Sequence, residues 1–587
     1  MEPPVAEPLP GVRRDATLSP RPVEAEHAAL DLPTAEKLVV VGAVMLGLFL
    51  GALDQTIVGV ALPRIVSDLH GSDLYTWVVT AYLVTSTITV PIYGKLGDVF
   101  GRQRILIVGI VIFLAGSALS GLSQTMGELI IFRAIQGLGA GALFPISLAV
   151  IGDLFTPRER GRYQGLFGAV FGVSFLVGPF LGGYITDNIS WHWIFYVNLP
   201  VGVLALIAIS TQLPNVKTAA ARLADLDYLG VVLFTAAVVP LLLGLTFKGL
   251  AAASGSLYSW TDPRVGGLIL LSAVLFALFL VNESRARHPI IPLDLFTSGT
   301  LTAANIAVFM ISCAMFGVVI FLPVYYQVVR GISATASGYS MWPLLLGLIG
   351  TSVGAGIVMS RTGRYKLMLL VATAVLIVGT FLLTHLSAST PTPLLWLWLA
   401  LVGLGIGPSM SIYTVVVQNA APRERLGTAT STLTFLRQVG GAVGLAVAGT
   451  MFSQSLTTEL PKQLAAAHLP ASLVAGISKN GGGLSENNLD QVGNLGQTIL
   501  NSVPASARAG IRPFLDQIVN AIHGAISLAV GAVFWLALVT AVLAFLATMA
   551  LRELPLRTSM RHSAEEVVDI REGSDADGEL DVAAAAG

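Results

Sequence analysis

Long apolar runs recur along most of this 587-residue chain, and they restrict its fold more than any other feature. Hydrophobic residues make up 54% of the sequence and charged residues only 11%, which is far too apolar for an ordinary soluble domain. A helix needs about 20 mostly apolar residues to cross the hydrocarbon core of a bilayer. We therefore predict an all-α polytopic membrane protein with fourteen spans, at 38–61, 74–94, 104–123, 128–150, 163–185, 194–212, 228–247, 265–282, 301–323, 337–359, 367–386, 394–416, 428–452 and 523–550.

Basic residues alternate between the loops on the two sides of the predicted membrane. Most of them follow even-numbered spans, as at 95–104 after the second span, 158–162 after the fourth and 361–366 after the tenth. Cytoplasmic loops carry the excess of Lys and Arg in membrane proteins. The alternation predicts an even number of spans in a multi-pass protein of the cell membrane, with both termini in the cytoplasm.

Three polar segments lie outside the predicted spans. Residues 1–37 and 551–587 contain prolines or many acids, and we expect disordered cytoplasmic tails. Residues 453–522 form an extracytoplasmic insertion. This insertion either extends its flanking helices beyond the membrane and shields a lipid-like substrate, or is a tolerated surface loop.

Two loop sequences occur twice and indicate an internal repeat. Pro-Arg-Glu-Arg stands at 157–160 and again at 422–425, while a Gly-x6-Gly-Arg pattern stands at 94–102 and again at 356–364. Both pairs are displaced by nearly the same number of residues, and internal repeats are common in transporters. The repeat predicts two six-helix bundles, at 38–212 and 301–550, with an inserted helix pair and its linkers at 213–300.

Asp54 lies alone in the first apolar run, where a carboxylate is costly to hold and therefore indicates a functional site. Its surroundings at 53–63 resemble the first-helix signature of the 14-helix drug:proton antiporters of the major facilitator superfamily. Further segments carry the same resemblance: the loop at 94–104, the glycine-rich run at 133–141, the Gly-Pro motif at 178–183, and the segments 191–200, 227–230 and 283–293. The resemblance implies the major facilitator fold, with two inserted helices and export driven by the proton gradient.

The loop at 94–104 resembles the gating motif of that superfamily. Its candidate gating residues are Gly94, Asp98, Gly101, Arg102 and Arg104. Charge pairs and helix-end dipoles at such a junction latch two helices together, and breaking the latch would let the bundles rock apart. Ser360 replaces the acid in the second copy, so we expect an asymmetric latch. The alternative is a loop that only sets topology.

Three residues are candidates for proton coupling: Asp54, Arg133 and Arg437. Alternate exposure of Asp54 to the two sides of the membrane would change its protonation during a cycle. Either arginine is a candidate partner, because a buried guanidinium stays charged and needs a counter-charge. Arg133 has a purely structural alternative in bonds to backbone carbonyls, and Arg437 has one in snorkelling to the cytoplasmic edge.

The segment at 178–183 resembles the motif associated with antiporters, with Gly178, Pro179, Gly182 and Gly183 as its core. Pro179 removes a helix hydrogen bond, and we expect the glycines to pack against the opposing bundle. This motif favours an exporter over a nutrient importer.

The sequence also limits the substrate. No second acid lies deep in any predicted span, so we expect lipophilic compounds that are neutral or monocationic. The polar side chains that could contact such a compound are Gln136, Asn305, Gln327 and Tyr413. Each of these four is equally consistent with an interhelical hydrogen bond.

Other functional classes lack the motifs they need. The sequence contains neither a Gly-x4-Gly-Lys-Ser/Thr phosphate loop nor a His-Glu-x2-His metal motif, and its net charge of −1 does not favour nucleic acid. We expect no enzyme activity and no cofactor. The expected partners are a lipophilic substrate, protons and the bilayer, with the protein acting as a monomer. An exporter of an endogenous lipid or natural product is the alternative, and a non-transporting sensor is less favoured.

Overall fold

The computed structural model describes residues 33–69, 74–213, 227–249, 258–422, 425–467 and 512–556. Within these residues the regular structure is helical, and fourteen helices are long and apolar enough to span a membrane. The predicted fold class and number of spans are confirmed. The predictions for most of the two tails and for the middle of the 453–522 insertion concern residues outside the described part.

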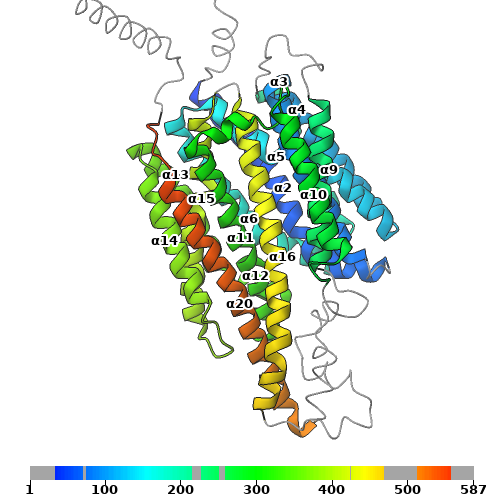
Figure 1. Cartoon of the computed structure of the whole chain (residues 1–587). Coiled ribbons are helices and arrows are strands. Elements are labelled where there is room, and N and C mark those ends of the chain that lie inside the picture. Colours follow the sequence, from blue (N-terminus) through cyan, green and yellow to red (C-terminus); the bar gives the residue numbers. More distant parts are fainter. Residues whose placement is uncertain are drawn as a thin grey trace, which may run out of the picture.

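The fourteen spans form two six-helix groups and an inserted pair (Figure 1). The first group comprises α2 (Thr34–Asp68), α3 (Tyr75–Phe100), α4 (Arg102–Leu122), α5 (Met126–Leu154), α6 (Pro157–Asn188), and α7 (Trp193–Tyr196) with α8 (Asn198–Gln212). The inserted pair comprises α9 (Tyr228–Gly249) and α10 (Leu268–Glu283), the latter preceded by η3 (Pro263–Gly267). The second group comprises η4 (Leu293–Thr297), α11 (Gly299–Val328), α12 (Ala334–Tyr339), α13 (Trp342–Thr362), α14 (Lys366–Leu383), α15 (Thr392–Ala420), α16 (Leu426–Ala466), and η8 (Arg512–Phe514) with α20 (Leu515–Ala550).

Several helix bounds differ from the prediction. The tenth predicted span is divided into α12 and α13, and the sixth into α7 and α8. The largest difference is in α16, whose 41 residues correspond to about 60 Å at 1.5 Å per residue, twice the thickness of the hydrocarbon core. With α20 it projects beyond the other helices (Figure 1), so both edges of the 453–522 segment continue the flanking helices.

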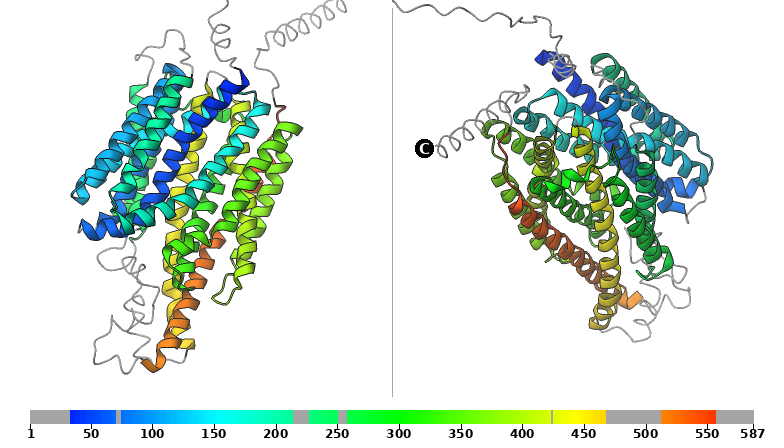
Figure 2. Two further views of the ribbon diagram at one scale, coloured as in Figure 1. Left: turned by 180° about the vertical axis from the view of Figure 1, so that it is seen from behind. Right: turned by 45° about the horizontal axis from the view of Figure 1, so that its top comes forward.

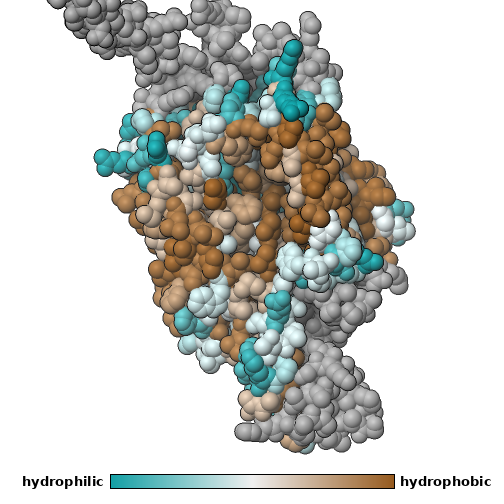
Figure 3. Space-filling view, in the orientation of Figure 1, coloured by the Kyte–Doolittle hydropathy of each residue, from teal (hydrophilic) through white to brown (hydrophobic). Residues whose placement is uncertain are grey.

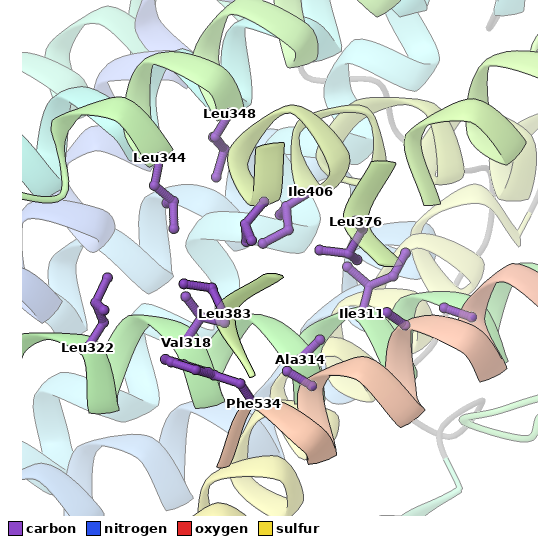
Figure 4. Packing of buried hydrophobic residues seen from close by; sticks show 14 of the residues in the cluster. Ile311, Ala314, Val318, Leu322, Leu344, Leu348, Leu376, Leu383, Ile406 and Phe534 are labelled. Carbon is purple, nitrogen blue, oxygen red and sulfur yellow. The ribbon is translucent and has the colours of Figure 1, made fainter. Parts of the chain in front are cut away.

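Each six-helix group has an apolar interior of its own. In the second group, side chains from α11, α13, α14, α15 and α20 interdigitate, as Figure 4 shows for Val318, Leu348, Leu376, Ile406 and Phe534. Apolar side chains also cover the outer surface midway along the helices, while polar ones gather near both ends (Figure 3). An apolar belt over a separately packed interior is the pattern expected of a protein embedded in lipid.

The two groups lie side by side, as the views from behind and from a raised angle in Figure 2 show, and they contact each other along two seams. One seam joins α6 to α13, where Gly161 and Gly356 bring the backbones together. The other joins α3 to α16, where Gly94 lies directly against Ser431. The inserted pair packs on this second seam, and the rings of Phe234 on α9 and Phe435 on α16 lie 5.1 Å apart.

Glycines on α5 hold the first group together at close range. Gly137 and Gly141 lie against α3, whereas Gly139 lies against the backbone of α4 at Gly109 and Phe113. Small residues at such positions allow helix backbones to approach without side chains between them. Span α5 is therefore clamped on two sides, and this clamp fixes the position of Arg133 near its beginning.

We predict that Gly139→Ala destabilises the protein, because the new methyl group would overlap the α4 backbone, at a cost of about 1–3 kcal/mol. The thermal midpoint of the purified protein should fall. Gly127→Ala on the same helix is the matched control, since no atom lies within 4 Å of its added carbon. Equal midpoints for the two variants would show that α4 and α5 are not packed this closely.

Candidate functional site

Asp54 lies at the centre of a buried polar cluster formed by five spans of the first group. Its side chain is 0% exposed. Oδ2 accepts a hydrogen bond from Nη1 of Arg133 on α5 at 2.8 Å. Oδ1 accepts one from Nε2 of Gln136 at 2.8 Å and another from Nδ2 of Asn198 at 3.0 Å. The carboxylate thus has three N–H donors, which is the condition under which a charge can remain in a membrane interior.

Arg133 is fixed by contacts other than the ion pair. Its Nη1 also donates to Oε1 of Gln136 at 2.7 Å, and its guanidinium carbon lies 4.2 Å from the centre of the Tyr82 ring and 5.9 Å from that of Phe195. Aromatic faces attract a guanidinium and exclude water from it. Its Nε has no hydrogen-bond partner among the described residues. This N–H is therefore free to donate to another group if the cluster rearranges.

The sequence did not identify Asn198, Ser117 or Tyr82 as parts of this cluster. Asn198 donates to Oγ of Ser117 at 3.1 Å as well as to Asp54, and Ser117 donates to the Phe195 carbonyl. Asn198 does lie in the 191–200 segment that carries part of the family resemblance, which was the available signal. Ser117 is a small residue in an apolar helix and gives no comparable signal.

Arg437 does not partner Asp54 in this structure. Its Nη2 donates to the Ser409 carbonyl of α15 at 3.3 Å, and the part of the chain that the structure describes supplies it with no ion pair. Arg133 is the partner of Asp54 here, because α5 packs on α2 in the same bundle, whereas α16 belongs to the other bundle.

Three of the four predicted substrate contacts hydrogen-bond to other protein groups instead. Gln136 belongs to the Asp54 cluster, Gln327 donates to Ser337 on α12 at 3.2 Å, and Tyr413 bonds to Thr548 on α20 at 2.6 Å. Each of these three side chains thus makes an interhelical hydrogen bond, as the alternative describes. Asn305 is buried as well, but its Oδ1 has no partner in the described structure.

The expectation that the 178–183 glycines pack on the opposing bundle is wrong. Gly178 and Gly182 lie against Thr56 and Ile57 of α2, within their own bundle, and Gly183 is partly exposed. A helical repeat indicates which residues share a face but not which helix covers that face. Pro179 approaches the second group, 4.0 Å from the position of a carbon added at Gly338 on α12.

Asp98 forms a latch between the two bundles, at the end of α3. Its carboxylate accepts hydrogen bonds from the backbone N–H of Gly427 at 2.9 Å, and from the N–H and the hydroxyl of Thr428, both at 2.7 Å. These groups belong to the first turn of α16, where unpaired N–H groups and the helix dipole attract an anion. We call this contact the α16 latch.

Arg102 connects the α16 latch to α5. It pairs with Asp98 at 2.6 Å and with Asp153, near the end of α5, at 2.9 Å. Gly101 adopts a φ of 94° between α3 and α4, a backbone conformation that favours glycine. Arg104 is exposed.

The second repeat makes a different contact at the same end of the molecule. Arg158, at the start of α6, donates to the carbonyls of Ser360 and Arg361 at 2.9 and 2.8 Å. This contact is a second latch, between α6 and α13, and it differs from the α16 latch. A carboxylate holds the beginning of a helix in the α16 latch, whereas a guanidinium holds the end of a helix in the second latch. In each case the charged group lies at the helix end whose dipole has the opposite sign: the Asp98 carboxylate at the beginning of α16, and the Arg158 guanidinium at the end of α13.

We predict that Asp98→Asn loosens the bundles at this end, because the charge that orders the first turn of α16 is lost. In a Cys313→Ser background, a cysteine placed at buried Thr430 should react with a maleimide roughly tenfold faster, as the loss of charge-assisted hydrogen bonds implies. Asp294→Asn is the control, since its pair with Arg425 is exposed and contributes little. An unchanged labelling rate in Asp98→Asn would contradict the latch.

Comparisons with known proteins agree with this architecture. Residues 44–445 match the model of the Major Facilitator Superfamily. The chain belongs to the major facilitator superfamily. It is 36% identical over 519 residues to the multidrug transporter protein MdtP of Bacillus subtilis, covering 86% of this chain and 93% of that protein. The fourteen spans and this similarity place it in the 14-helix branch, as the sequence motifs predicted.

Other relatives broaden the comparison. The chain is 33% identical to the acurin A biosynthesis cluster MFS-type transporter of Aspergillus aculeatus, over 75% of this chain and 78% of that one. Among solved structures, the proton:xylose symporter XylE superposes with a TM-score of 0.53 at 14% identity, covering 77% of this chain and 94% of that chain. The latter similarity concerns the fold alone. By family, the chain is a multi-pass membrane transporter of small molecules.

Proposed function

We propose that this protein exports lipophilic small molecules across the cell membrane in exchange for protons, with both termini in the cytoplasm. The observation that carries the proposal is the Asp54–Arg133 pair, sealed from solvent and bonded through three donors. A purely structural ion pair in a membrane span is an expensive way to join helices. A titratable pair of this kind supports a role in proton coupling.

Protonation of Asp54 would change the balance of charge inside the first bundle. The neutral acid no longer compensates Arg133, and an uncompensated buried guanidinium is costly. The cluster would then rearrange or open so that Arg133 regains a partner or water. In this way the arrival of a proton supplies free energy for a conformational change, and its release resets the pair.

Opening of the α16 latch would turn that change into a movement of the two bundles. The present state is closed where α3 meets α16 and where α6 meets α13. Alternating access in such transporters consists largely of one bundle rocking against the other. Breaking both latches would open this end of the protein while the packing inside each bundle is retained.

An exporter of an endogenous lipid or natural product is the second candidate. The long α16 and α20 favour it, because they extend beyond the membrane where a lipid-like molecule would need cover. The similarity to a transporter from a biosynthesis cluster points the same way. Both candidates share the proposed coupling site and differ only in the molecule carried.

We predict that Asp54→Asn abolishes movement driven by a pH gradient, because the amide carries no exchangeable charge. The protein in liposomes would be tested with a cationic, a neutral and an anionic lipophilic dye: ethidium, N-phenyl-1-naphthylamine and its 8-sulfonate. Gradient-dependent rates for the mutant should fall to those of protein-free liposomes.

Asp187→Asn, at the exposed end of α6, is the matched control and should behave as wild type. Gradient-driven movement that survives in Asp54→Asn would place coupling elsewhere. If wild type moves none of the dyes at any gradient, the proposal of drug export fails, and the endogenous-substrate reading becomes the one to pursue.

A further inference from the structure

Arg437 holds a positive charge deep inside the second bundle with no acid beside it in the described structure. It lies roughly 16 Å along α16 from Leu426, given a rise of about 1.5 Å per residue. Ser409, which accepts its hydrogen bond, lies about as far from the end of α15. Both therefore lie about three turns inside their helices, beyond the reach of an arginine that snorkels to a helix end.

The neighbours of Arg437 on its helix face show where it points. Gly440 and Gly444, on the same face, lie directly against Phe309 and Cys313 of α11, and Cys313 Sγ donates to the Gly440 carbonyl at 2.9 Å. Residues three, four and seven apart share one side of a helix. Arg437 therefore belongs to the stripe of α16 that faces α11 and the interior, and it keeps partial exposure there.

The register between the two helices places Asn305 at the level of Arg437. Phe309 opposes Gly440 and Cys313 opposes Gly444, so α11 and α16 run in the same direction and keep the same register over this turn. One turn earlier on α11 is Asn305, which is only 6% exposed. Its Oδ1 has no partner, and no side-chain hydrogen bond is formed by this amide within the described residues. Buried amides are normally bonded, so this one is available to a ligand.

We propose that Arg437 and Asn305 form the recognition site for the acidic group of an amphiphilic substrate, such as a sulfonate, carboxylate or phenolate. A guanidinium matches the geometry of such oxyanions, and the Asn305 amide can turn its N–H toward the same group, because no hydrogen bond holds its Oδ1 in place. The inference rests on the proposed export function and narrows its substrate. A cationic substrate would meet an uncompensated charge of its own sign in a medium of low dielectric.

This assignment replaces the sequence-based expectation of a monocationic substrate. That expectation used only the absence of a second deep acid. The cluster around Asp54 does not offset Arg437, because its two charges already compensate each other. Among the described residues, nothing in the second bundle balances the charge of Arg437 until a substrate arrives.

The test compares two dyes that differ by one sulfonate group, N-phenyl-1-naphthylamine and its 8-sulfonate. Binding of each dye to the protein in nanodiscs is measured by equilibrium dialysis, and the binding to empty nanodiscs is subtracted. Transport of each dye is measured with the protein in liposomes under a pH gradient. Wild type should prefer the sulfonate and exclude ethidium. Arg437→Gln should weaken sulfonate binding roughly tenfold or more, as expected for a lost charge-assisted contact, and leave the neutral dye unchanged.

Three further variants sharpen the result. Arg437→Lys keeps the charge and should retain part of the preference, Asn305→Ala should weaken only the sulfonate, and Arg285→Gln removes an exposed arginine and should have no effect. The inference is overturned if Arg437→Gln affects both dyes equally or leaves their ratio unchanged. If wild type binds the sulfonate selectively but no gradient moves any of the dyes, the recognition site stands and the export proposal fails.

Discussion

An unbalanced charge inside a membrane is costly, and the Asp54–Arg133 pair avoids that cost in the first bundle. The need to surround both ions explains why α2, α4, α5 and α8 converge at one point of the first bundle. It also explains the aromatic rings over the guanidinium, which keep the pair dry. The glycines of α5 allow this convergence, because larger side chains would hold the spans apart.

One helix links this ion pair to the contact between the bundles. Span α5 carries Arg133 near its beginning and Asp153 near its end, about 30 Å away at helical rise. Asp153 binds Arg102, and Arg102 binds Asp98 of the α16 latch. A tilt of α5 that follows loss of the Asp54 charge would therefore reach the latch through packed, hydrogen-bonded groups.

The sequence predicted what depends on hydrophobic length and on rare residues. Fourteen apolar runs gave fourteen spans, and the isolated acid and arginine of the first bundle do meet. Small polar residues such as Ser117 gave no signal, since they are common in membrane helices for packing alone. The neighbours of Gly178 and Gly182 could not be predicted either, because helix periodicity defines a face without identifying the helix that covers it.

The two halves of the repeat share a backbone arrangement but differ in charge. Counted along the repeat, Asp54 corresponds to a position near Phe316, whose ring packs on Gly441 of α16. The first bundle thus holds a balanced pair, whereas in the second no acid among the described residues pairs with Arg437. Under the proposed exchange, proton and substrate would not compete for one carboxylate. Exchange would then depend on the contact between the bundles, and the latches would set how strictly one movement follows the other.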